Sequence, residues 1–226
     1  MDVINIVKVI TAVIAIIITF SAGFIELRLN SKNWLNRWFA LFFFSGSLGF
    51  LAYTIYHLIT CSGCELIVIS IMIPAQIFFN FIPISLVMTV FILEYPNVAM
   101  SLKYLGTMIA LFILISFGYF IWVPTLDPIS YNQGIINTET PLGWFIFVNV
   151  IRIGLAIYVV YKYAMITRKT EGETKKRIQW FFVGIITVIV GLFINLVGGY
   201  FNIFFEIVAL ILFTIGAILI VKGFFM

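Results

Sequence analysis

Two charged residues stand within long apolar segments in the second half of the sequence. Arg152 follows the run GWFIFVNVI, and Glu206 precedes the run IVALILF. A charged side chain at membrane depth is costly, and it usually faces a partner charge, a ligand or a water-filled cavity. We consider two arrangements: an Arg152–Glu206 ion pair that locks the bundle, or an arginine that receives an anionic ligand with Glu206 as its resting partner.

Further polar residues accompany these two charges in the apolar segments. Several come in pairs three or four residues apart, which places both side chains on one face of a helix. Together they could line a cavity that opens outward between helices. The alternative is ordinary interhelical hydrogen bonding, worth about 0.6 kcal/mol per contact, with His57 as a residue of the membrane interface. The candidate ligand-binding set is Tyr53, His57, Gln76, Asn80, Asn149, Arg152, Asn195 and Glu206.

Cys61 and Cys64 form a Cys-x-x-Cys pair in a short polar segment. Two cysteines cannot complete a four-ligand zinc site without further ligands. A local disulfide is plausible where the segment faces an oxidising compartment, and free thiols or a redox-active pair are the alternatives.

Several catalytic and cofactor sites lack the residues that they require. The single histidine, His57, excludes a histidine cluster or a triad, and we find no serine nucleophile elbow and no paired intramembrane aspartates. Lys222, at the end of the last apolar segment, is the only lysine there, so a retinal Schiff base at mid-span is not expected. We therefore predict no enzyme activity, no metal site and no cofactor.

The composition indicates that the solvent of this chain is lipid. Hydrophobic residues make up 63% and charged residues 10% of 226 positions, against roughly 25% charged in soluble domains. A helix needs about 20 apolar residues to cross the membrane, and seven segments qualify. The first is too long for a cleaved signal peptide. We predict one all-α domain, residues 1–226, with spans over 3–27, 38–60, 66–93, 101–123, 143–167, 178–197 and 202–223.

The distribution of lysine and arginine predicts the orientation. Basic residues gather in alternate connections, whereas the segments 61–65, 124–142 and 198–200 have none. Because basic loops face the cytoplasm, we expect the amino terminus outside and the carboxyl terminus in the cytoplasm. The most basic connection is a solvated topology anchor, or a docking surface for a cytoplasmic partner or for anionic lipid headgroups. Its basic residues are Arg168, Lys169, Lys175, Lys176 and Arg177.

Two further features concern packing. The connection 124–142 is long and contains three prolines; it either folds over the bundle as a lid or is disordered. Small residues allow close approach of membrane helices, and they recur in two spans. They are Ser45, Gly46 and Gly49 in the second span, with Gly184 and Gly191 in the sixth.

Two short motifs resemble the seven-helix amino-terminal sensing module of some prokaryotic histidine kinases and diguanylate cyclases. One is Phe91-Ile92-Leu93-Glu94-Tyr95 at the end of the third span. The other is the basic entry and apolar run KKRIQWFFVG, residues 175–184, followed by Asn195. The resemblance implies a sensor whose output domain follows the last span. Because this sequence ends at Met226, we expect a separate partner to carry the output, unless the sequence is a piece of a longer protein.

These observations predict a receptor-like sensor in the cell membrane. It would bind a small ligand, anionic where Arg152 receives it, in an outward-facing cavity and signal through its cytoplasmic loops to a partner protein. The alternatives are a small transporter or channel, and a structural or accessory subunit that binds another membrane protein. We expect no nucleic-acid partner, because no arginine-rich face is present.

Overall fold

The computed structural model describes residues 3–97, 99–198 and 203–225, with the side chains of residues 198, 203, 224 and 225 left undescribed. Seven helices in this part are long and apolar enough to cross a membrane. Their bounds are α1 Val3–Asn30, α2 Trp34–Leu58, α3 Glu65–Glu94, α4 Leu102–Ile121, α6 Leu142–Arg168, α7 Gly172–Gly198 and α8 Ile203–Phe225. The chain is a multi-pass membrane protein, as predicted, with all seven spans near their expected positions.

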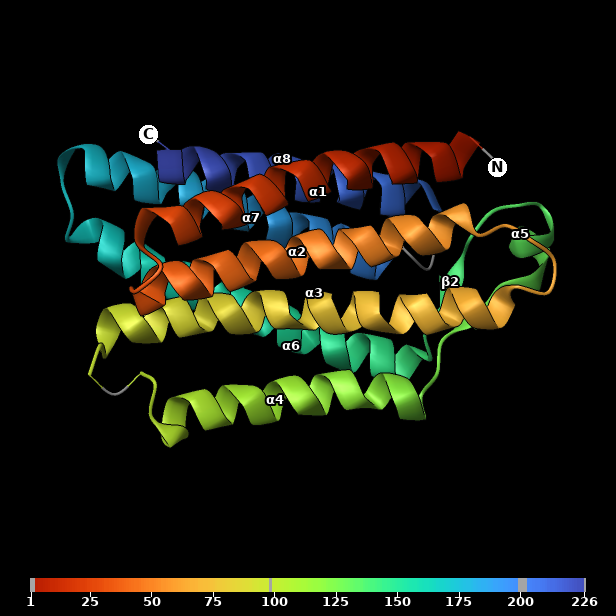
Figure 1. The fold of residues 1–226 in the computed structure, drawn as a ribbon, viewed down its shortest axis with the longest axis horizontal. Coiled ribbons are helices and arrows are strands. Elements are labelled where there is room, and N and C mark those ends of the chain that lie inside the picture. Colours follow the sequence, from red (N-terminus) through yellow and green to blue (C-terminus); the bar gives the residue numbers. More distant parts are fainter. Residues whose placement is uncertain (1–2, 98, 199–202, 226) are drawn as a thin grey trace.

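Six of these helices form a closed ring. Around the ring α1 packs on α2, α2 on α3, α3 on α6, α6 on α7, α7 on α8 and α8 on α1, while α4 lies outside against α3. The helices run side by side along the long axis of the molecule (Figure 1). The hairpin end of the bundle carries the start of α1, the α2–α3 turn and residues 122–141. The basic end carries residues 31–33 and 169–171.

The first helix shows how lipid as solvent inverts the usual pattern of burial. Its buried stripe holds small and polar residues three or four positions apart: Asn5, Lys8, Ala12, Ala15, Thr19, Ala22, Gly23 and Glu26. Bulky side chains such as Ile17, Phe20 and Phe24 are exposed. Without a hydrophobic driving force between membrane helices, association depends on close packing and interhelical hydrogen bonds. The small stripe therefore faces the ring and the bulky residues face the lipid.

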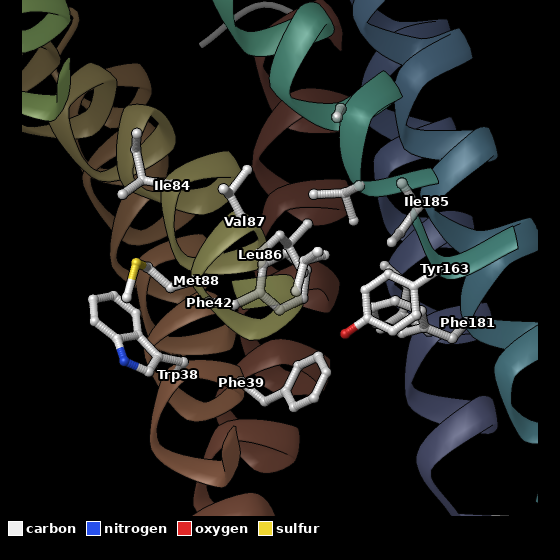
Figure 2. Close-up of a cluster of buried hydrophobic side chains, with 14 of the residues drawn as sticks. Trp38, Phe39, Phe42, Ile84, Leu86, Val87, Met88, Tyr163, Phe181 and Ile185 are labelled. Carbon is white, nitrogen blue, oxygen red and sulfur yellow. The ribbon is translucent and has the colours of Figure 1, made fainter. Parts of the chain in front are cut away.

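The largest buried cluster lies in the half of the bundle toward the basic end. Phe42 of α2 and Leu86 of α3 lie opposite Ile185 of α7, with Tyr163 and Phe181 beside it (Figure 2). The hydroxyl of Tyr163 lies 2.9 Å from that of Thr89 on α3. This cluster joins α2, α3, α6 and α7 into one packed unit.

The connection of residues 122–141 has structure of its own at the hairpin end. Strands β1 (Thr125–Leu126) and β2 (Thr138–Glu139) pair antiparallel, and the short helix α5 (Pro128–Asn132) lies between them. Asp127 caps α5 by accepting from the amides of Ile129 and Ser130. The hydroxyl of Ser130 and the amide of Ile129 lower the pKa of this carboxyl.

The most basic connection differs from the prediction of a ten-residue turn. Only residues 169–171 separate α6 from α7, so that Arg168 belongs to α6 and Lys175, Lys176 and Arg177 belong to α7. The chain reverses at Gly172, whose φ of +63° suits a residue without Cβ. Glu173 in the first turn of α7 favours the helix start through the helix dipole. Four of the five basic residues thus belong to two helix ends, and Lys169 lies in the short connection between them.

Glycine sets the distance between α7 and α8. A Cβ atom at Gly184 would lie 2.7 Å from the backbone nitrogen of Ile220 and 2.8 Å from the carbonyl oxygen of Gly216. At Gly191 it would lie 2.8 Å from the Phe213 ring. The predicted close packing at Gly184 and Gly191 is confirmed.

We expect Gly184→Ala to destabilise the protein by about 1–3 kcal/mol, because the facing backbone must move to admit the methyl group. Thermal unfolding of the purified protein in detergent measures the loss. Gly154→Ala is the matched control, since a Cβ there meets nothing within 4 Å. Equal transition temperatures for the two variants would contradict the packing described here.

Candidate functional site

A cavity of about 820 Å³ lies inside the helix ring. Side chains from all seven long helices line it, with Thr19 from α1 and Tyr119 from α4, and residues of the 122–141 connection line one end. Six of the eight predicted ligand-binding residues belong to its lining: Tyr53, Gln76, Asn149, Arg152, Asn195 and Glu206. Five helices, α2, α3, α6, α7 and α8, thus bring most of the predicted set to one cavity.

Arg152 is held by uncharged groups. Its Nε donates to Asn80 Oδ1 at 2.8 Å, and its Nη2 donates to Gln76 Oε1 at 3.0 Å and to the Gln76 carbonyl oxygen at 3.2 Å. Tyr119 of α4 donates to the same Gln76 Oε1 at 3.3 Å. The residue is 8% exposed. These hydrogen bonds fix the direction of the guanidinium. Because their acceptors are neutral oxygens, they do not balance its positive charge.

Asn80 is fully buried and lies behind the cavity wall rather than in it. Its amide nitrogen donates to the carbonyl of Ile115 at 2.9 Å and to Ser116 Oγ at 3.3 Å, both on α4. Its oxygen is thereby turned toward Arg152. Asn80 is a positioning residue, and it links the arginine to the helix outside the ring.

Glu206 pairs with Lys8, so the predicted Arg152–Glu206 ion pair is wrong. The Lys8 Nζ lies 2.5 Å from Glu206 Oε2, and Tyr53 donates its hydroxyl to Glu206 Oε1 at 2.8 Å. Lys8 is fully buried, whereas about a quarter of the Glu206 side chain is exposed. In the ring α8 packs against α1, whereas α7 lies between α8 and α6. Glu206 of α8 therefore lies beside Lys8 of α1 rather than beside Arg152 of α6.

Lys8 is the functional candidate that sequence reasoning missed. It stands inside the first apolar segment, residues 3–27, but it is not in the predicted ligand-binding set. The signal was present, because a lysine in a spanning segment needs a partner as much as an arginine does.

The 122–141 connection is pinned across the hairpin end. Asn5 donates to the Gly134 carbonyl at 2.6 Å and accepts from the Ile136 amide at 3.3 Å. Lys8 also donates to the Ile136 carbonyl at 3.4 Å, and Tyr131 donates to the Cys61 carbonyl at 2.7 Å. The connection 122–141 was predicted to be either a lid or disordered. In the structure it is ordered and covers one end of the cavity, and we refer to it as the cover.

Four of the predicted residues have their own local contacts. His57 is buried behind the wall, with its Nδ1 2.9 Å from the Tyr53 carbonyl oxygen and its ring against Tyr53 and Tyr56. Asn149 uses its amide nitrogen on the carbonyl of Phe145, one turn earlier in its own helix. Cys61 and Cys64 form a disulfide across the α2–α3 turn, beside the bond from Tyr131.

A second ion pair lies near the basic end. Lys162 Nζ lies 2.8 and 2.9 Å from the two carboxylate oxygens of Glu94, the glutamate of the FILEY motif. About a fifth of each side chain is exposed. This pair joins α3 to α6 outside the cavity lining.

Comparison with known proteins finds no match to a family model, to a curated protein or to a solved structure. The fold and the cavity define the class: a seven-helix integral membrane protein whose six-helix ring encloses a chamber with polar residues toward its hairpin end.

We expect Glu206→Gln to destabilise the protein by about 3–5 kcal/mol, because Lys8 would remain as an unpaired buried charge. Lys8→Met should cost a similar amount, and the double variant should cost much less than the two together. Thermal unfolding in detergent measures all three.

Lys162→Met is the control for this cycle. Its ion pair is partly exposed, so its loss should cost about 1 kcal/mol or less. Strict additivity of Lys8→Met and Glu206→Gln would contradict a coupled buried pair.

Proposed function

We propose that this protein is a receptor-like membrane sensor that binds a small anionic molecule in the chamber between its helices. The observation that carries the proposal is the state of Arg152: a buried guanidinium at membrane depth that faces a large cavity and has only neutral hydrogen-bond partners.

The charges around the cavity support an anionic ligand. In the described ranges the ion pairs are Lys8–Glu206 and Lys162–Glu94, so Arg152 has no carboxylate partner there. The charge of Glu206 is balanced by Lys8, and Glu139 is an exposed residue of the cover. An arginine at the centre of a membrane helix costs roughly 2.5–3.5 kcal/mol on insertion scales. A ligand carboxylate or phosphate would offset this cost through paired, charge-assisted hydrogen bonds.

Signalling requires that the ligand distinguish two arrangements of the helices. Arg152 is well placed for this, because its partners lie on α3 and, through Asn80 and Gln76, reach α4. A ligand that draws the guanidinium away from these partners changes the contacts among three helices. We propose that this change reaches the basic end, where α3 and α6 meet again at Glu94 and Lys162, and there alters contact with a partner protein.

The proposal includes the orientation predicted from the basic residues, with the cover outside the cell. We expect a cysteine at Asn132 to react with a membrane-impermeant maleimide in intact cells, and a cysteine at Glu173 to react only after permeabilisation. Both substitutions are made in a Cys61→Ser/Cys64→Ser background. The reverse labelling pattern would overturn the orientation.

We expect the purified protein to bind at least one anion from a panel of butanoate, succinate, inorganic phosphate and dodecanoate, measured by isothermal titration calorimetry. Arg152→Gln should weaken that binding at least tenfold, since one charge-assisted bond to a buried site contributes about 1.5–3 kcal/mol. Lys175→Gln removes an equal charge outside the cavity and should leave affinity unchanged.

Wild-type affinity in Arg152→Gln would remove the arginine from the site, and failure of every anion to bind would overturn the proposed function. Uptake of the bound anion into sealed vesicles that contain the protein distinguishes a transporter from a sensor. Flux that is abolished by Arg152→Gln would favour transport over sensing.

A further inference from the structure

The cavity is long, and its two halves differ in chemistry. Its lining extends over Phe42–Tyr56 of α2, Met72–Leu86 of α3 and Glu206–Ile220 of α8. Each of these stretches rises about 21 Å at 1.5 Å per residue. The cavity is therefore about 21 Å long as judged from each of the three helices. A volume of about 820 Å³ spread over that length makes a channel-like chamber rather than a compact pocket.

Polar groups occupy the half toward the hairpin end. Tyr53, Gln76, Asn149, Asn195 and Glu206 line this half, and the cover adds Thr138, Glu139 and Thr140. Arg152 lies at the inner limit of this polar half, level with Gln76 through their hydrogen bond. An anionic group held by Arg152 would therefore sit at the boundary between the two halves.

Beyond Gln76 the lining toward the basic end is almost entirely apolar. On α3 it continues as Phe79, Ile82, Pro83 and Leu86, about 15 Å further along the helix. The side chains opposite are Phe42, Phe43, Ala156, Ile185, Val188, Ala217 and Ile220. Thr19, the exception, gives its hydroxyl to the carbonyl of Ala15 in its own helix. No charged side chain belongs to this part of the described lining.

We propose that the ligand is a single-chain anionic amphiphile, with a carboxylate or phosphate at Arg152 and Gln76 and an alkyl chain in the apolar half. This inference rests on the proposed function, because it assigns the head group to the same arginine. A short polar anion would leave about 15 Å of apolar chamber without a partner, whereas an alkyl chain fills a long narrow space with apolar walls.

Chain length is the first arm of the test. Binding of butanoate, octanoate and dodecanoate to the full chain in detergent is measured, with free aqueous ligand determined separately. Affinity should rise by up to about fourfold per methylene. Equal affinity for butanoate and dodecanoate would overturn the amphiphile while leaving the proposed anion-binding function intact.

Head-group chemistry is the second arm. Dodecanoate and dodecyl phosphate should both bind, and dodecanol should bind at least tenfold more weakly. Equal binding of dodecanol would overturn both the inference and the role of Arg152. A phosphatidic acid with two acyl chains tests whether the ligand is a membrane lipid. If it binds more tightly than dodecyl phosphate, the assignment of a single-chain ligand is overturned.

Filling the apolar half is the third arm. Ala217 lines the chamber and is 8% exposed, so Ala217→Phe should reduce dodecanoate affinity at least tenfold and leave butanoate binding unchanged. Ala110→Phe, on the exposed face of α4, is the matched control. Unchanged dodecanoate binding in a folded Ala217→Phe protein would overturn the assignment of the alkyl chain.

Discussion

The ion pair between Lys8 and Glu206 holds together the first and the last helix of the ring. Both charges lie at membrane depth, where each would be unfavourable alone, and their contact joins α1 to α8. Closure of the ring encloses the cavity, and the same lysine also bonds the Ile136 carbonyl of the cover. This one ion pair therefore helps to close the ring, to enclose the cavity and to hold the cover across the end of the cavity.

Arg152 illustrates the opposite treatment of a buried charge. The structure surrounds it with amide and carbonyl oxygens, which satisfy hydrogen bonds without cancelling charge. Such a group is stabilised in position but still attracts an anion, because electrostatic interactions are strong where water is scarce. The carboxylate of Glu206 is paired with Lys8, whereas the guanidinium of Arg152 has only neutral partners. The net charge at the cavity wall is therefore positive beside Arg152.

The sequence predicted the spans well because hydropathy over about twenty residues reports directly on helices in lipid. It also placed Tyr53, Gln76, Arg152 and Glu206 near one another, since helical spacing and depth restrict where such residues can point. It could not assign partners. Whether Glu206 meets Lys8 or Arg152 depends on which helices are neighbours in the ring, and that order leaves little trace in composition or spacing.

The same limit explains Asn80 and the cover. Asn80 belongs to the predicted ligand-binding set, with interhelical hydrogen bonding as its alternative; in the structure it lies outside the cavity lining, accepts from Arg152 and donates to α4. The ordered state of residues 122–141 depends on Asn5, Lys8 and Cys61, which are far away in sequence. Local turn signals could indicate a break between spans but not what the connection would pack against.

The distance in sequence between Lys8 and Glu206 has a consequence for biogenesis. Lys8 enters the membrane with α1, and its counter-ion arrives only with α8, after five further spans have been made. The stabilisation that this ion pair gives α1 is therefore absent until α8 has been made, and a chain without α8 leaves Lys8 without its counter-ion. An uncompensated charge at membrane depth is costly, so closure of the ring depends on α8.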